Sequence, residues 1–280
     1  MSQSAEEFLK AFHDNNPGLQ SVSVEASRTA KGRTSYEEFA DRVDAPGRVL
    51  DLGCADGALL EVLAGRGART LAGVDLSAEE LELARRRPAL VNADLRRGRA
   101  QELPFENAAF DAVVSHMALM LMTDVEQVVA EVARVLVPGG VFAVALGGGA
   151  VEGEGMALFL ELARPHFEAA REAGRRMPRM GDRKIRTREG LDAVLTPAGF
   201  APVSWDSIVL DQSGTPEKVW ETNVSVFYDV EVLDEDQIVE LRREFLDKAR
   251  SLVSDGRLPC GMRINIATTR RRAFTVTGEM

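Results

Sequence analysis

The sequence predicts an α/β fold of the doubly wound type, in which helices cover both faces of a parallel sheet. Between residues 48 and 146, short apolar runs alternate with helical stretches, and this alternation is typical of parallel strands joined by crossover helices. The first apolar run leads into a turn that contains Gly53 and Gly57, and a helical stretch begins at Ala58. A strand, a glycine turn and a helix in this order bring backbone close to a ligand at the carboxyl edge of such a sheet.

The composition is that of a globular protein with a sizeable core. Of the 280 residues, 45% are hydrophobic and 28% are charged, which are ordinary values. The net charge of −10 argues against a nucleic-acid or anionic-membrane partner. Cys54 and Cys260 are the only cysteines, so there is no disulfide framework, and we expect reducing, cytoplasmic surroundings. We expect neither a signal peptide nor a membrane span, because the N-terminus lacks a basic and then apolar pattern and no apolar run is long enough.

Residues 1–46 are expected to form an N-terminal helical cap. Apolar residues recur at helical spacing at 5–12 and again at 35–43, and the turn residues at 15–18 end the first of these helices. Such a cap either packs over the first strand or forms a lid over the ligand, and the pattern favours neither.

Residues 47–149 hold the expected ligand-binding core. The clearest helix spans 123–136, where valines and a leucine at helical spacing form one apolar face. Ser77 with Glu80, and Thr123 with Glu126, have the spacing of capping boxes, in which two side chains satisfy free backbone N–H groups at a helix start. The strands of this part are expected at residues 49–52, 70–74, 94–98, 110–115 and 141–146.

The alternation stops at three consecutive glycines, 147–149. Residues 150–190 are expected to form a helical insertion after the fifth strand, kinked or interrupted at Pro165. Its part from 164 to 188 carries nine Arg or Lys residues against three acidic ones. Residues 191–280 are expected to complete the same sheet. Here we predict a sixth strand at 203–210, a last strand at 262–267, and helices at 191–195, 216–228 and around 238–245.

Glycines and acidic residues at the expected strand ends indicate a nucleoside site. Gly53 and Gly57 remove side chains from the turn, and Asp75 at the end of the second strand can accept hydrogen bonds from both hydroxyls of a ribose. A dinucleotide fingerprint would need a G-x-G pair, which is missing, and Asp56 is expected near the position of a pyrophosphate. Since a carboxylate repels an anion, a nucleoside that carries a positive charge, such as S-adenosylmethionine, fits better than NAD.

Five motifs in order resemble those of class I S-adenosylmethionine-dependent methyltransferases, of the small-molecule type related to the ubiquinone/menaquinone-biosynthesis C-methyltransferases. Two positions depart from the family pattern: Ala55 stands where glycine is usual, and Arg99 stands where many relatives have an aspartate that contacts the adenine amino group. The resembling stretches are residues 49–57, 73–77, 98–105, 110–116 and 135–140.

The resemblance implies S-adenosyl-L-methionine as the cofactor and a Rossmann-like, seven-stranded, mostly parallel sheet whose last strand is antiparallel. It implies no metal site. The residues that it places around the methyl donor are Asp51, Gly53, Cys54, Ala55, Gly57, Asp75, Leu76, Ala100, Gln101, Ser115 and His116.

His116 is the candidate catalytic residue. It follows the fourth strand, and an imidazole that titrates near neutral pH can take a proton from a hydroxyl acceptor. A base is needed only when the nucleophile must lose a proton, because methyl transfer depends mainly on holding donor and acceptor in line. The alternative is that His116 only packs, or contacts the donor through its backbone carbonyl.

Two groups of residues bear on the acceptor. The apolar residues after His116 either pack in the core or form a pliable apolar wall for an apolar or aromatic acceptor; they are Met117, Leu119, Met120, Leu121 and Met122. Basic residues of the insertion either form a solvated face or guide an anionic acceptor or an acidic carrier protein that bears it. These basic residues are Arg171, Arg175, Arg176, Arg179, Arg183, Lys184, Arg186 and Arg188.

The sequence therefore predicts a methyltransferase that acts on a small molecule, with O-methylation of a hydroxyl or carboxylate of a secondary metabolite as the favoured reaction. The alternatives are C- or N-methylation in the same fold, an NAD-dependent oxidoreductase, and a non-catalytic protein that binds S-adenosylmethionine.

Overall fold

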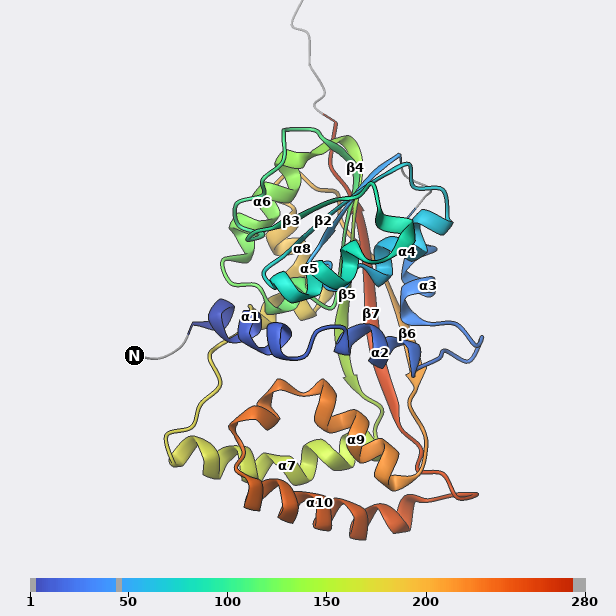
Figure 1. Cartoon of the computed structure of the whole chain (residues 1–280), viewed down its shortest axis with the longest axis vertical. Coiled ribbons are helices and arrows are strands. Elements are labelled where there is room, and N and C mark those ends of the chain that lie inside the picture. The colour runs from blue at the N-terminus through green and yellow to red at the C-terminus, as the bar shows by residue number, and fades with distance from the viewer. Residues whose placement is uncertain (1–3, 44–46, 274–280) are drawn as a thin grey trace, which may run out of the picture.

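The computed structural model describes residues 4–43 and 47–273. Its centre is a seven-stranded sheet in the order β3-β2-β1-β4-β5-β7-β6 (Figure 1). β7 runs antiparallel to both of its neighbours, and the other pairs are parallel. The predicted α/β fold with an antiparallel last strand is confirmed. The strands are β1 Arg48–Leu52, β2 Thr70–Asp75, β3 Asp94–Arg97, β4 Phe110–His116, β5 Leu136–Ala150, β6 Ser204–Asp211 and β7 Gly261–Arg270.

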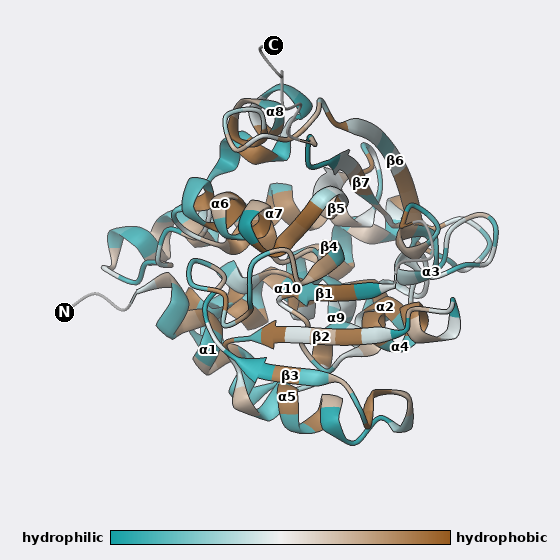
Figure 2. Ribbon diagram, turned by 90° about the horizontal axis from the view of Figure 1, so that it is seen from above, coloured by the Kyte–Doolittle hydropathy of each residue, from teal (hydrophilic) through white to brown (hydrophobic). Residues whose placement is uncertain are grey.

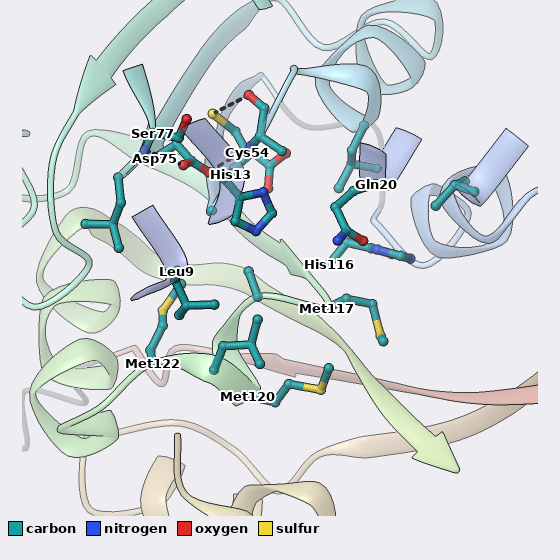
Figure 3. Close-up of a pocket in the computed structure, with 18 of the residues that line it drawn as sticks. Leu9, His13, Gln20, Cys54, Asp75, Ser77, His116, Met117, Met120 and Met122 are labelled. Carbon is teal, nitrogen blue, oxygen red and sulfur yellow. Dashed lines mark hydrogen bonds between the residues drawn. The ribbon is translucent and has the colours of Figure 1, made fainter. Parts of the chain in front are cut away.

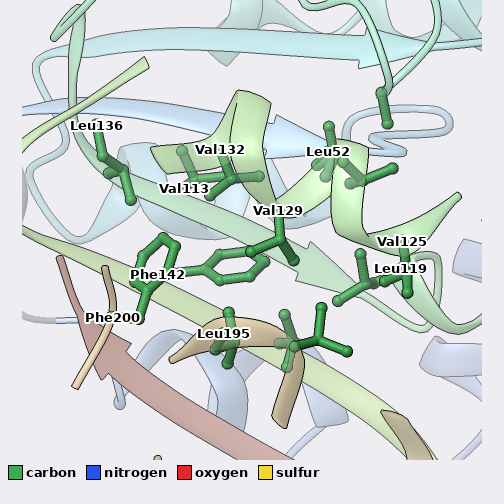
Figure 4. Packing of buried hydrophobic residues seen from close by; sticks show 14 of the residues in the cluster. Leu52, Val113, Leu119, Val125, Val129, Val132, Leu136, Phe142, Leu195 and Phe200 are labelled. Atoms are coloured by element: carbon green, nitrogen blue, oxygen red, sulfur yellow. The ribbon is translucent and has the colours of Figure 1, made fainter. Parts of the chain in front are cut away.

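The inner parallel strands β1, β2 and β4 are largely hydrophobic because helices bury both of their faces, whereas β3 at the edge is mostly hydrophilic (Figure 2). One apolar cluster lies on the side of α3 (Ser35–Ala40), α4 (Ala58–Gly65) and α5 (Ala78–Arg85). The other includes the buried valines of α6 (Val125–Val135), which pack against β4 and α8 (Arg188–Leu195) (Figure 4).

Of the two predicted capping boxes, one is formed only in part and the other is not formed. Ser77 caps α5, since its hydroxyl accepts from the Glu80 N–H (3.2 Å). The Glu80 carboxylate does not complete the box, because it contacts the His13 ring and the Gly18 N–H instead. The box of Thr123 and Glu126 is wrong. α6 begins after Asp124, whose left-handed backbone (φ 51°) gives no side-chain cap, and the Thr123 carbonyl instead accepts from the Gln101 amide (2.9 Å).

A second layer of helices lies beyond the carboxyl edge of the sheet (Figure 1). It consists of α7 (Gly155–Glu172), α9 (Pro216–Val226) and α10 (Glu235–Ala249), and it has its own apolar cluster. α7 continues through Pro165 without interruption. The predicted insertion at 150–190 therefore shares a hydrophobic core with α9 and α10, which follow it in the sequence. The predicted boundary at residue 190 divides the residues of this core.

The first two helices, α1 (Ala5–Asn15) and α2 (Leu19–Glu25), cross between the sheet and this second layer (Figure 1). α2 was not predicted. β5 is longer than predicted and runs through the glycines at 147–149 with a shift of register against β7. None of the helices in the described part of the chain has the length and apolarity that a membrane crossing needs.

Candidate active site

A cavity of about 190 Å³ lies at the carboxyl edge of the sheet, beneath α1 and α2. Parallel strands place the ends of β1, β2 and β4 side by side at this edge, so residues distant in sequence meet there. Figure 3 shows Asp75, Ser77 and Cys54 at one end of the cavity and Met120 and Met122 at the other.

The glycine turn after β1 is fixed by its contacts with β2. The N–H groups of Gly53 and Cys54 both donate to the carbonyl oxygen of Val74 (2.9 and 3.1 Å). Gly53 has φ +76°, and a Cβ there would lie 2.5 Å from the Cβ of Ala118. A side chain at this position would therefore be strained and would clash, which explains the glycine.

Asp75 connects the turns after β1 and β2. Its two carboxylate oxygens accept from the N–H groups of Ala55 and Ser77, each at 2.9 Å. Asp75 also lines the cavity, and its carboxylate has lone pairs left to accept further hydrogen bonds from a ligand there. Burial raises the pKa of Asp75, although the two N–H donors partly offset this effect.

Asp51 is the most perturbed acid of the cavity. It is 2% exposed, and its Oδ1 atom has no hydrogen-bond partner within the described residues. Burial, together with the negative charges of Asp75 and Asp56, raises the pKa of Asp51 to about 8. A cationic group bound beside it would supply the missing partner and stabilise its ionised form.

Asp56 does not face the ligand space, where the sequence predicted it. It lies outside the cavity lining. Its carboxylate is paired with the Arg87 guanidinium (2.5 Å) and accepts from the Ser21 hydroxyl (2.6 Å). The argument that Asp56 repels a pyrophosphate is therefore wrong. Asp51 and Asp75 are the carboxylates that favour a cation in this cavity.

His116 lies between two aromatic rings. The ring centroids of Tyr36 and Phe39 are 4.7 and 5.6 Å from that of His116, and its Nε2 atom is buried without a hydrogen-bond partner among the described residues. Burial lowers the pKa of His116 to about 3. Such an imidazole is neutral at physiological pH and a weak base, so its environment works against the predicted base role.

The N-terminal helices close the cavity. Glu6, Leu9 and His13 of α1 line it, as do residues of α2. The His13 ring contacts Glu80 through Nδ1 (3.0 Å) and the Tyr228 hydroxyl through Nε2 (3.2 Å). His13 thus connects α5 to the second helical layer. α1 and α2 lie over the cavity, and α3, which packs beside α4, contributes Ser35 and Tyr36 to its lining.

Comparison with known proteins relates part of the chain to methyltransferases. Residues 50–144 match a family model described as a methyltransferase domain. The chain is 38% identical over 110 residues to a fatty-acid O-methyltransferase of Mycolicibacterium smegmatis, which covers 38% of the chain and 40% of that protein. It is 33% identical over 155 residues to the methyltransferase GfsG of Streptomyces halstedii, which covers 50% of the chain and 54% of that protein. The chain carries a class I S-adenosylmethionine-dependent methyltransferase domain. The matched parts span only about half of these curated relatives.

Solved structures extend the likeness of fold beyond the methyltransferase domain. The [4+2]-cyclase SpnF has a TM-score of 0.59 at 19% identity, with 97% of this chain and 98% of that chain covered. The protein YcgJ of Bacillus subtilis has a TM-score of 0.55 at 20% identity, with 85% and 98% covered. At such low identity these likenesses concern the fold alone.

Most of the residues that the sequence placed around the donor of the methyltransferase domain lie along one cavity. They are Asp51, Gly53, Cys54, Ala55, Asp75, Leu76, Ala100, Gln101 and His116.

Two predicted contact residues do not line the cavity. Ser115 is fully buried, and its hydroxyl donates to the Leu52 carbonyl (2.9 Å) and accepts from the Leu119 N–H (3.1 Å). Gly57 is required by packing, because a Cβ there would lie 2.5 Å from a Leu90 methyl group. Both residues shape the turns without reaching the ligand space.

The cavity also contains residues that the sequence analysis did not assign to the site. Several of them carry polar groups, and nothing in their local sequence indicates which strand end they face. They include Glu6, His13, Gln20, Ser27, Ser35, Tyr36, Ser77, Gln212 and Tyr228.

None of the basic residues named from the insertion lines the cavity. Arg175 pairs with Asp234, and Lys184 pairs with Glu126. Among the described residues, the basic side chain in the lining is Lys10, which forms an ion pair with Asp14. The cavity itself therefore offers no free cation to an anionic acceptor.

Proposed function

We propose that this chain transfers the methyl group of S-adenosylmethionine to an oxygen atom of a small, largely apolar molecule. The observation that carries the proposal is the buried carboxyl of Asp51 and the half-buried carboxylate of Asp75 at one end of a cavity whose other end is lined by methionines. A cationic nucleoside fits the first end, and an apolar acceptor fits the second.

The residues present suit the donor. Asp75 would hold the ribose hydroxyls, and the unpartnered Oδ1 of Asp51 would accept from the donor's ammonium group. Near Ala100, the Glu6 carboxylate is held by the Arg99 guanidinium (2.6 and 2.7 Å) and the Gln101 amide (3.2 Å). The carboxylate of Glu6 thus lies beside Arg99. At the position of Arg99, many relatives have an aspartate that contacts the adenine amino group. When bound, S-adenosylmethionine supplies an electrophilic methyl group.

The environment of His116 bears on which oxygen is methylated. A hydroxyl acceptor must lose a proton, but a histidine with a pKa of about 3 takes one up poorly. A carboxylate is already ionised at neutral pH and needs no base. We therefore favour a carboxylate as the methylated group, and the relative named a fatty-acid O-methyltransferase supports this choice. In this proposal the basic residues of the insertion have no part, because none lines the cavity.

The first experiment compares S-adenosylhomocysteine and NAD by isothermal titration calorimetry, with Asp75→Asn as the site variant and Asp94→Asn as a control in the exposed pair with Arg96. We expect binding of S-adenosylhomocysteine alone, weakened in Asp75→Asn and unchanged in Asp94→Asn. Binding of NAD instead would refute the proposal and support the oxidoreductase alternative.

The second experiment measures transfer. S-adenosylmethionine with a tritiated methyl group is incubated with a panel of medium- and long-chain carboxylic acids and their hydroxylated forms, and methyl esters are extracted. Ester formation that Asp75→Asn reduces is the expected result. Donor binding without methylation of any acid or alcohol would support the non-catalytic alternative.

A further inference from the structure

The proposed positions of the ribose and the ammonium group imply that the donor's base lies on the β3 side of Asp75. Asp75 ends β2 and would hold the ribose, and Asp51 in β1 would hold the ammonium group. The base and the amino-acid arm leave the ribose on opposite sides of its ring oxygen. Since β2 lies between β3 and β1, an arm that extends over β1 directs the base towards β3. Asp75 is paired with Arg97, the last residue of β3, so the turn after β3 begins level with the ribose.

Two segments enclose the β3 end of the cavity. The first is the turn after β3, which is held beside Asp75 because the Gly98 N–H donates to the Asp75 carbonyl (3.0 Å). Ala100 and Gln101 of this turn line the cavity. The second is α1, whose lining residues recur at intervals of three and four and therefore share one face of the helix. They are Glu6, Leu9, Lys10 and His13.

Glu6 brings a carboxylate to this end of the cavity. Its oxygens accept from the Arg99 guanidinium (2.6 and 2.7 Å) and from the Gln101 amide (3.2 Å). Because Gln101 itself lines the cavity, the carboxylate that it holds lies at the cavity wall. The three bonds leave one of its about four lone-pair positions open, and the Glu6 side chain is 27% exposed. A group in the cavity can therefore still donate to it.

This carboxylate distinguishes ligands by the direction of the hydrogen bond. Arg99 binds it through two parallel bonds and does not line the cavity, so Arg99 fixes the carboxylate without competing with the ligand. An ionised carboxylate has only acceptor oxygens. It attracts an amino group and repels a carbonyl oxygen. Adenine carries an amino group on the edge of its ring, whereas hypoxanthine carries a carbonyl oxygen at the same position.

We propose that Glu6 selects the base of the methyl donor by accepting a hydrogen bond from the amino group of adenine. The inference rests on the proposed function, from which it takes the positions of the ribose and the ammonium group. Within the described residues, the other acids that line the cavity are Asp51 and Asp75, and both are assigned to other parts of the donor. Helix α1 thus supplies a part of donor recognition that the sheet does not.

The test compares the affinities of three ligands for the full chain by isothermal titration calorimetry. The ligands are S-adenosylhomocysteine, its analogue with hydrogen in place of the amino group, and S-inosylhomocysteine, which has a carbonyl oxygen there. In the wild type, we expect S-adenosylhomocysteine to bind about 10- to 100-fold more tightly than the hydrogen analogue, as one hydrogen bond to a charged acceptor implies. S-inosylhomocysteine should also bind weakly, because its carbonyl oxygen faces the carboxylate.

Two variants of Glu6 should change this preference. Glu6→Leu removes the carboxylate, so the affinity ratio of S-adenosylhomocysteine to the hydrogen analogue should fall to about one. Glu6→Gln has an NH₂ group that can donate to a carbonyl oxygen, so it should raise the affinity of S-inosylhomocysteine relative to S-adenosylhomocysteine. It also provides a second variant if the first does not fold. Glu102→Gln changes an exposed acid that does not line the cavity, and it should leave the ratios unchanged.

The affinity ratios separate recognition of the base from a structural role of Glu6. If Glu6 only held α1 through Arg99, its replacement would weaken the three ligands alike and leave the ratios as in the wild type, and this result would overturn the inference. Equal affinities of S-adenosylhomocysteine and the hydrogen analogue for the wild type would overturn it as well. A wild type that binds none of the three ligands would instead refute the proposed function, so the two failures are distinguishable.

Discussion

Donor binding should depend strongly on pH because of Asp51. In the free protein the pKa of this buried acid is about 8, raised by burial and by the neighbouring charges of Asp75 and Asp56. A bound ammonium group favours the ionised carboxylate and lowers this pKa. Below pH 8 the free protein therefore carries a proton that must leave when the donor binds. The affinity rises with pH up to about 8 and then levels off.

The size of the effect follows from the two protonation states. If the bound cation returns the pKa of Asp51 to the ordinary aspartate value of about 4, the dissociation constant falls about fiftyfold between pH 6 and pH 8. This change corresponds to about 2.3 kcal/mol of binding free energy. In this window the amino group of S-adenosylhomocysteine stays protonated, so the ligand does not contribute the slope.

Calorimetric titration of S-adenosylhomocysteine at pH 6, 7 and 8 measures this slope. Paired buffers of different ionisation enthalpy should report release of close to one proton at pH 6.5. Asp51→Asn cannot release a proton, so its affinity should change little over the same range. A wild-type affinity independent of pH, or an equal slope in Asp51→Asn, would refute the assignment of the linkage to Asp51.

Three further results are expected. The ring of His116 should not titrate between pH 8 and pH 5 in an NMR experiment, because burial keeps it neutral, and a midpoint near 6.5 would contradict this. His13→Ala removes both hydrogen bonds of its ring and should lower the free energy of unfolding by about 1–3 kcal/mol, with faster amide exchange confined to α1; unchanged exchange would count against a closing role. Arg87→Leu leaves Asp56 buried without its ion pair and should cost about 3–5 kcal/mol in urea denaturation, whereas Arg85→Leu, from an exposed pair, should cost less than about 1 kcal/mol.

The sheet was predictable because its signals are local. The inner parallel strands are mostly apolar and buried on both faces, as in Ala112 to Val114 and in Val49 to Leu52, where Asp51 is the polar exception. Strand direction then follows from the crossover helices, and parallel direction brings the strand ends together. The order of strands and helices along the chain was therefore enough to predict that Asp51, Asp75 and His116 lie at one edge of the sheet.

The direction of a side chain within a turn was not predictable in the same way. Asp56 is one residue from Gly57 and was assigned to the ligand space on that ground. It turns inward instead because Arg87 and Ser21 lie beneath the turn. Glu80 shows the same effect. Its spacing from Ser77 suits a capping box, but its carboxylate is fully buried and accepts from the Gly18 N–H (2.9 Å).

The contacts of α1 and α2 with the strand ends explain why local sequence patterns did not predict that these helices line the cavity. The segment of α1 and α2 is bonded to each of the turns after β1, β2 and β3, through side chains 35, 63 and 93 residues apart in sequence. These pairs are Ser21 with Asp56, Asp14 with Ser77, and Glu6 with Arg99. The same three turns carry Ala55, Asp75 and Ala100 along the cavity. The N-terminal helices therefore line the same cavity as these turns, and their contribution is visible only once the sheet has brought the turns together.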